Sequence, residues 1–316
     1  METTELELFR RSIRRATETC GDESLDGALD ELGWRDALLA DRSSAVSLLF
    51  EAQGLAVADS SALDWLLAAA LGEEDGGHAS VVLPPLRRPE APARIRGGRC
   101  EVRGLGTKAL ARGDTAVVVA ETDEGPVAFT VKASALELRH VRGLDPWLGL
   151  VEVTADLDAG ATRPVDWAGA ASLGQLALGH QLVGLARAML ELARRHALDR
   201  VQFGRPIGSF QAIRHRLAES LIALEAADGL LAAAWDDPSP VTAAMAKGMA
   251  GRSARTVARH AQQVLAGIGF TTEHPLHRYV RRTIVLDQLL GASSVLTAQL
   301  GQDVLERATL PPTFPL

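Results

Sequence analysis

Four long segments rich in alanine and leucine fill the second half of the chain and constrain its fold most. After Arg163-Pro164 the apolar residues recur at helical spacing, and the segments cover 167–198, 210–235, 241–264 and 276–308. Asp236 to Pro240 is a polar, proline-bearing stop between the second and third segments. Long helices with short connections favour an up-and-down four-helix bundle.

The core of this bundle must be made largely from small side chains. Hydrophobic residues are 47% of the 316-residue chain, but aromatic residues are only 4%. Alanine, leucine and valine therefore supply most of the core, and such helices can pack closely. The first segment carries glycines five residues apart, which we interpret as close helix contacts: Gly169, Gly174, Gly179 and Gly184.

The first half of the chain has a different pattern. Up to about Leu71, apolar residues again recur at three- and four-residue spacing, which predicts helices. Short β-rich runs follow at 115–120 and 126–131 with a turn at Asp123-Glu124-Gly125 between them, and another strand is expected at 150–154. We therefore predict a mainly α protein with a small β-domain, divided into a shortened helical domain (1–79), a reduced β-domain (80–163) and the bundle (164–316).

Charge and cysteine content exclude several classes of protein. The formal net charge is −7, whereas nucleic-acid-binding domains usually present a basic face. Cys20 and Cys100 lie far apart, which favours a reducing cytoplasm over a disulfide framework. His274 and His277 have a metal-like spacing, but Pro275 lies between them and no cysteine or further histidine is near in sequence. We expect a cytoplasmic protein with no metal site and no nucleic-acid or membrane partner.

Two motifs in the second half carry groups suited to a dinucleotide. The first is Arg200-Val-Gln-Phe-Gly-Arg-Pro-Ile-Gly-Ser-Phe-Gln211, and the second runs from Gln263 to Thr271 as Gln-Val-Leu-Ala-Gly-Ile-Gly-Phe-Thr. The guanidinium of Arg200 is suited to a diphosphate, and Phe203 can lie against an adenine ring. Gln211 and Gln263 can donate to phosphate or ribose oxygens, and Gly267 allows a ligand to approach the backbone.

Together these motifs resemble the R-x-x-F-G-x-P-I-x-x-F-Q and Q-x-x-G-G-x-G-F-T signatures of the acyl-CoA dehydrogenase family. The resemblance is strong from about Gly169 onward and loose before it. It implies a helical domain, a middle β-domain and a C-terminal four-helix bundle, with FAD as the cofactor. In the family these positions hold the ADP half of an FAD whose isoalloxazine lies on a neighbouring subunit. The resemblance thus assigns to that role Arg200, Phe203, Gln211, Gln263 and Gly267, while Ala266 replaces a family glycine and narrows the groove.

The catalytic base of the family is missing from its usual positions. The family desaturates an acyl-CoA thioester: a carboxylate takes the α-proton and the β-hydrogen leaves as hydride to the flavin. The usual glutamate aligns with Leu290, and the position used by a minority of members aligns near Gly174. Neither residue accepts a proton. Asp287, one helical turn before Leu290, is the best local substitute, although a solvated or paired helix carboxylate is the favoured interpretation.

The flavin-facing part of the middle domain is also eroded. No Thr-Glu-Pro segment occurs near Leu83-Pro-Pro-Leu86, and the later flavin-facing strand aligns with 106–111 without its tryptophan. The chain thus resembles the short, base-lacking subunit of the heteromeric α2β2 acyl-CoA dehydrogenases of steroid-degrading actinobacteria. That resemblance implies a subunit that supplies the ADP half of the FAD site, while a longer partner supplies the base for desaturating a steroid-derived CoA thioester. Two alternatives stay open: a self-sufficient homo-oligomer using Asp287, and a flavin-free scaffold or regulatory subunit.

Overall fold

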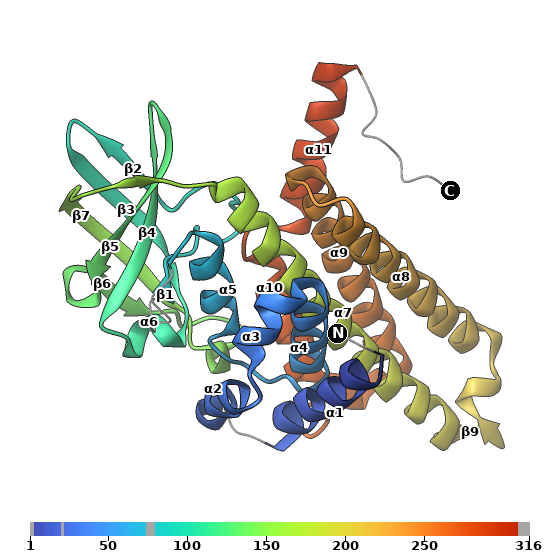
Figure 1. Ribbon diagram of the computed structural model, residues 1–316. Helices are drawn as coiled ribbons and strands as arrows, with labels where there is room; N and C mark the ends of the chain where they lie inside the picture. The colour runs from blue at the N-terminus through green and yellow to red at the C-terminus, as the bar shows by residue number, and fades with distance from the viewer. Residues whose placement is uncertain (1–2, 20–21, 74–79, 309–316) are drawn as a thin grey trace.

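The computed structural model describes residues 3–19, 22–73 and 80–308 (Figure 1). The first segments are helices, as their spacing predicts, and these helices pack on the long first helix of the bundle mainly through α4. These helices are α1 (Thr3–Thr19), α2 (Asp22–Glu31), α3 (Trp34–Ala40), α4 (Arg42–Ala56) and α5 (Ala62–Ala70). The predicted break at 73–77 lies largely outside the described residues.

The β-rich middle forms one mixed, mainly antiparallel sheet in the order β6-β7-β3-β2-β4-β5-β8, with β1 pairing parallel to β4. Its inward side chains form a separate small core that includes Cys100, Val102 and Val118. The strands are β1 (Ser80–Val81), β2 (Ala93–Arg96), β3 (Arg99–Gly106), β4 (Thr115–Thr122), β5 (Gly125–Lys132), β6 (Glu137–His140), β7 (Val151–Asp158) and β8 (Arg163–Pro164). Short helical turns accompany them: α6 (Lys108–Arg112), η1 (Ala133–Ala135) and η2 (Pro146–Leu148).

One strand alignment from the sequence was wrong. The strand expected at 106–111 is in fact β3, which ends at Gly106, and residues 108–112 form α6. Thr107 caps this helix because its hydroxyl accepts a hydrogen bond from the Ala109 amide at 3.2 Å. A hairpin joins β2 to β3 through Gly97 and Gly98, both with positive φ.

The second half forms the predicted helical bundle. Asp166 caps α7 by accepting from the Gly169 amide, and Ser239 with Thr242 forms a capping box at the start of α9. The elements are α7 (Trp167–Asp199), β9 (Val201–Gln202), β10 (Arg205–Pro206), η3 (Ile207–Ser209), α8 (Gln211–Asp236), α9 (Pro240–Leu265), η4 (Ala266–Phe270), α10 (Leu276–Gln288) and α11 (Ser293–Arg307). The single fourth helix expected over 276–308 is therefore two helices, broken at 289–292.

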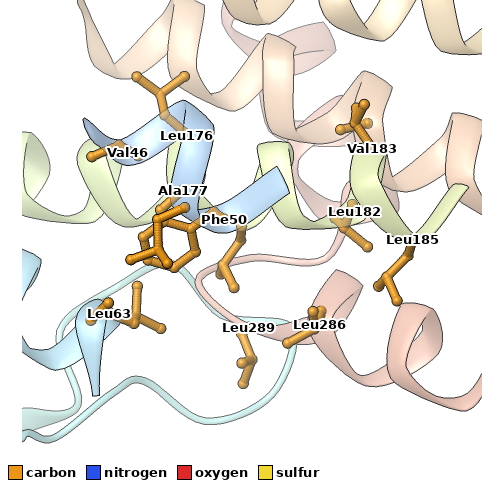
Figure 2. Packing of buried hydrophobic residues seen from close by; sticks show 14 of the residues in the cluster. Val46, Phe50, Leu63, Leu176, Ala177, Leu182, Val183, Leu185, Leu286 and Leu289 are labelled. Atoms are coloured by element: carbon orange, nitrogen blue, oxygen red, sulfur yellow. The ribbon is translucent and has the colours of Figure 1, made fainter. Parts of the chain in front are cut away.

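Three of the four predicted glycines, Gly174, Gly179 and Gly184, let backbone or side-chain atoms of other elements lie very close to α7. A Cβ on Gly184 would lie 2.2 Å from the Glu51 carbonyl oxygen, and one on Gly179 would lie 2.7 Å from the Leu231 side chain. At Gly169 the nearest group is only the capping Asp166. Figure 2 shows Val46 and Phe50 of α4 in the core that this close approach creates.

Residues 276–307 are long and apolar enough to cross a membrane by length and composition alone. The structure divides this stretch into α10 and α11, and 44% of its most apolar window is buried inside the protein. A partly buried, broken helix of this kind is a weak indication of a membrane span.

Buried polar contacts fix the β-domain against both helical regions. Asp64 on α5 accepts hydrogen bonds from the Val81 amide at 3.0 Å and from the Thr107 hydroxyl at 2.7 Å. On the other side, Arg282 of α10 pairs with Asp145, and both side chains are almost fully buried. These contacts are costly to break because each partner left behind would be buried without compensation.

We predict that Asp64 makes the stability of the fold depend on pH. Burial raises the pKa of this carboxyl from 3.8 to about 6. The folded chain therefore holds the proton more tightly than the unfolded chain, so the stabilisation is full below about pH 4 and is lost as the pH rises through about 6. Asp64→Asn should flatten the pH dependence of the free energy of unfolding over this range by about 2–3 kcal/mol. Urea titrations at several pH values measure this, with the exposed Asp123→Asn as control; an unchanged profile would contradict the assignment.

Candidate functional site

The first motif forms the loop between α7 and α8 at one end of the bundle (Figure 1). Here β9 and β10 make a small hairpin whose two-residue turn is Phe203-Gly204, with φ of 53° and 76°. A non-glycine residue in this left-handed conformation is strained, and Phe203 is also 93% exposed. The hairpin therefore presents an aromatic ring to the outside of the chain at the cost of backbone strain.

The second motif lies at the same end of the bundle because α8 and α9 run antiparallel. The register is fixed by His260 of α9, whose Nδ1 lies 3.0 Å from the Ser220 hydroxyl and 3.1 Å from the Arg216 carbonyl oxygen of α8. Gln263 lies about one turn after His260, near the end of α9. Because α8 and α9 are antiparallel, this places Gln263 near the start of α8, where Gln211 is the first helical residue. The structure thus gathers the five sequence-predicted cofactor residues at one end of the bundle.

These residues have the properties that an adenosine diphosphate group requires. Among the described residues, the side chains of Arg200, Gln211 and Gln263 have no hydrogen-bond or ion-pair partner, and all three are exposed. A Cβ placed on Gly267 would meet nothing within 4 Å, so its backbone is open to a ligand. A cation, two amides, an exposed aromatic ring and an open backbone fit a dinucleotide that bridges to another surface.

More aromatic surface surrounds this group. Phe203 meets Phe210 edge to face at a centroid distance of 6.1 Å, and the Arg205 guanidinium lies 4.4 Å from the Phe210 ring. Phe270, at the end of η4, is 72% exposed. Large exposed aromatics are unusual on a free surface and indicate a covered one.

Ala266 occupies a conformation that glycine adopts more easily. Its φ of 51° and ψ of −133° lie in a region that costs a side-chain-bearing residue about 1–3 kcal/mol. This is a physical reason for glycine at the aligned family position.

We predict that Ala266→Gly raises the free energy of unfolding by about 1 kcal/mol, measured by urea denaturation. Ala218→Gly, in the regular helix α8, is the control and should lower it; a loss of stability in Ala266→Gly would contradict the prediction.

The two positions aligned with the family base meet in the structure. Leu290 is fully buried, and a Cβ on Gly174 would lie 2.4 Å from Leu290 Cδ1. Leu67 and Leu63 of α5 lie 3.1 and 3.7 Å from the same point. Gln175 holds the turn by donating to the Leu290 carbonyl oxygen at 2.9 Å. This position is therefore apolar and closed, with no proton acceptor at it.

Asp287 lies in the same region, but its carboxylate is used by the fold. It is fully buried, and its oxygens accept from the Ser293 amide and hydroxyl, each at 3.2 Å. Arg255 lies 3.6 Å from it, and a Cβ on Gly251 would lie 2.0 Å from Oδ1. Asp287 is therefore enclosed by helices α9 and α11, which supports the structural interpretation made from the sequence.

The loop aligned with the flavin-contacting segment lines an open groove of about 990 Å³ on the sheet. Pro85 and Leu86 line it together with charged side chains of β3 and β7. These charges pair with each other: Arg99 lies 2.7 Å from Asp156, and Arg103 lies 2.6 Å from Glu101. Apolar side chains, among them Leu86, Val102 and Val153, line the rest of the groove, so its wall combines ion pairs with an apolar surface.

Some important residues carried no signal in the sequence. Lys247 of α9 looked like an ordinary helix lysine, yet it is fully buried and donates to the carbonyl oxygens of Asp287 at 3.0 Å and Gly291 at 2.5 Å. A lysine inside an alanine-rich segment was the only available hint.

The chain has a helical domain, a β-sheet and a helical bundle in this order, and groups suited to a dinucleotide lie at the end of the bundle. This is the order of domains in the acyl-CoA dehydrogenase fold. Residues 169–305 match the family model for the acyl-CoA dehydrogenase C-terminal domain. Acyl-CoA dehydrogenase IpdE2 of Mycobacterium tuberculosis is 33% identical over 198 residues, which are 62% of this chain and 60% of that protein. Benzylmalonyl-CoA dehydrogenase of Aromatoleum aromaticum is 42% identical over 131 residues, or 40% of this chain and 35% of that protein.

Solved structures agree over nearly the whole chain. The steroid acyl-CoA dehydrogenase Tcur3481–Tcur3483 has a TM-score of 0.80 at 25% identity, covering 96% of this chain and 98% of that one. The ChsE4–ChsE5 complex from Mycobacterium tuberculosis has a TM-score of 0.75 at 22% identity, covering 97% and 98%. Residues 169–305 belong to the acyl-CoA dehydrogenase C-terminal domain family, and the chain has the fold of these enzymes, for which FAD is the implied cofactor. The chain spans less than two thirds of the length of the two curated relatives above.

Proposed function

We propose that this chain is the base-lacking subunit of an FAD-dependent acyl-CoA dehydrogenase that desaturates a bulky, steroid-derived CoA thioester in the cytoplasm. One observation carries the proposal: among the described residues the side chains of Arg200, Gln211 and Gln263 are exposed and have no polar partner, whereas the base position is closed by Leu290. A chain built in this way can complete a cofactor site on another subunit, but it has no base of its own at the position the family uses.

Within such a complex, each group of this chain has a defined task. Arg200 neutralises the diphosphate, and Gln211 with Gln263 donates to its oxygens or to the ribose. Phe203 covers the adenine, and the backbone at Gly267 allows close approach. Bound FAD supplies the hydride acceptor, while a carboxylate of the partner removes the α-proton.

The exposed apolar surface of the bundle supports a protein partner. Besides Phe203 and Phe270, α8 exposes Ile222 (69%) and Leu221 (49%). Two structural neighbours are named as two-component assemblies, Tcur3481–Tcur3483 and ChsE4–ChsE5. We therefore propose a longer acyl-CoA dehydrogenase subunit as the partner, in an α2β2 heterotetramer.

The alternatives make different predictions. A self-sufficient homo-oligomer would need Asp287 as its base, and burial in the fold argues against this. A flavin-free scaffold would not need the exposed Arg200, Gln211 and Gln263, and its behaviour would not change when Arg200 is replaced.

We predict that Arg200→Ala weakens FAD binding by the complex about 10- to 100-fold, because one charge-assisted contact to the diphosphate is lost. FAD retained after gel filtration of the complex and FAD titration of the stripped complex both measure this. Arg14→Ala, on an exposed helix of the first domain, is the matched control and should bind normally. Full retention in Arg200→Ala would support the scaffold reading.

A further inference from the structure

A small cavity lies between the N-terminal helices and the β-domain. It measures about 260 Å³, which is below the usual range of about 300–1,000 Å³ for sites of drug-sized ligands, so it suits a smaller molecule. Its wall comes from α2, from residues 59–65 at the start of α5, from β1 and from residues 107–113 around α6. Figure 1 shows α5 and α6 towards the left of the view, whereas β9 at the end of the bundle lies on the far right.

Ser80 places an unsatisfied hydroxyl at this cavity. It is the first residue of β1, its side chain is fully buried, and its Oγ has no hydrogen-bond partner among the described residues. Ser80 lines the cavity, whereas the next residue, Val81, packs in the main hydrophobic core, as the alternation of a strand requires. Buried hydroxyls in folded proteins are nearly always satisfied. A polar ligand or a water molecule in the cavity can supply the missing partner.

Two carboxylates at the cavity lack a positively charged partner. Asp64 is buried and accepts from the two neutral donors described above, and Asp26 accepts from the Ser61 amide at 2.8 Å and the Ser61 hydroxyl at 2.7 Å. Among the described residues neither carboxylate forms an ion pair. Burial raises the pKa of Asp64 to about 6, and repulsion from Asp59 and Asp26 adds to this rise. A cation between these carboxylates would relieve the repulsion.

Most of the other charges at the cavity are paired. Asp59 lies 3.5 Å from Lys108, and Asp30 lies 3.2 Å from Arg35, while Arg112 also contributes to the wall. The wall as a whole has four aspartates, one lysine and one arginine, and therefore a formal net charge of −2. In the described part of the chain no three carboxylates, histidines or cysteines are placed to hold a metal ion. The negative charge thus suits an organic cation whose charges are separated.

We propose that this cavity binds a small organic dication, a short linear diamine. One ammonium group donates to Asp64 and to the Ser80 hydroxyl, and the other donates to Asp26. An ammonium has three donors and no acceptor, so it can satisfy a carboxylate and a hydroxyl together. The Trp65 ring, also part of the wall, offers an apolar surface to the methylene chain. This binding needs neither FAD nor a protein partner.

Isothermal titration calorimetry of the full chain with 1,4-diaminobutane tests the proposal. We expect saturable binding of one molecule per chain, whereas 1,4-butanediol, which has a similar shape but no charge, should not bind. Asp64→Asn should weaken diamine binding about 10- to 100-fold, because a charge-assisted hydrogen bond is lost. The exposed Asp123→Asn is the matched control and should bind normally. Absence of saturable binding, equal binding of the diol, or unchanged affinity in Asp64→Asn would overturn the proposal.

Ser80→Ala separates a role in ligand binding from a role in the fold, and it keeps the test valid if Asp64→Asn does not fold. Without the diamine, this variant should be at least as stable as the wild type, because it removes a buried hydroxyl that has no partner. Its affinity for 1,4-diaminobutane should fall about 2- to 10-fold, since one hydrogen bond is lost. The rise in Tm that the diamine produces should shrink accordingly. A large loss of Tm in the free variant, or an unchanged affinity for the diamine, would contradict the assigned role of Ser80.

Discussion

Gly54→Ala is expected to lower the free energy of unfolding by more than about 3 kcal/mol, because helices α4 and α7 touch through their backbones at this point. A Cβ on Gly54 would lie 2.2 Å from the Gln181 carbonyl oxygen and 2.8 Å from the Leu185 amide nitrogen. Backbone atoms cannot move aside as a flexible side chain can, so α4 would have to separate from the bundle. The packing of Phe50 on α4 would be disturbed at the same time.

Urea denaturation followed by circular dichroism measures this loss. Gly27→Ala is the matched control, because Gly27 lies on an exposed face of helix α2 and its Cβ would meet nothing within 4 Å. The control should gain about 0.5–1 kcal/mol from the higher helix propensity of alanine. Equal stability of the two variants would show that the two helices lie further apart than described.

Asp287→Ala is expected to lower the free energy of unfolding by about 3–5 kcal/mol. It removes a carboxylate that accepts two hydrogen bonds from Ser293 and lies near the buried Lys247. Asp287→Asn keeps the shape and one acceptor oxygen, so its loss should be much smaller. Thermal unfolding of both variants measures the difference.

The same pair of variants separates two accounts of catalysis. If Asp287 has a structural role, the complex that contains Asp287→Asn keeps its desaturation activity, because an amide still supports the turn. If Asp287 is the base, Asp287→Asn abolishes turnover although the protein stays folded. Activity assays of the folded complex with Asp287→Asn decide between these outcomes.

Much of the helical architecture could be predicted from the sequence because it depends on local periodicity. The segments 167–198, 210–235 and 241–264 lie close to the bounds of α7, α8 and α9. Gly179 and Gly184 are close contacts, as their five-residue spacing indicated. Small residues in long helices predict close approach, although they do not name the helix that approaches.

The break between α10 and α11 could not be predicted in this way. The sequence 276–308 has a continuous helical pattern, and its break depends on Lys247, which lies 40 residues away from Asp287 in the chain. Tertiary hydrogen bonds override local propensity there. The strand at 99–106 was missed for another reason, since the alignment followed the family motif and not the Gly97-Gly98 turn.

In the candidate site, too, features of sequence motifs could be predicted, and features that depend on tertiary contacts could not. Arg200, Phe203, Gln211, Gln263 and Gly267 belong to long motifs, and the structure places them at one exposed end of the bundle. The loss of a base at Leu290 and Gly174 was also visible in the sequence. That these two positions fill the same space was not visible, because it requires contact between α7 and the turn after α10.

The visible spectrum of the chain, purified alone and then co-expressed with an acyl-CoA dehydrogenase of the longer type, tests the central claim most directly. A shared site predicts no flavin absorbance from the chain alone and about one FAD per pair of chains in the co-purified complex. A yellow protein from the chain alone would contradict the shared site, and a colourless complex would contradict the role in FAD binding.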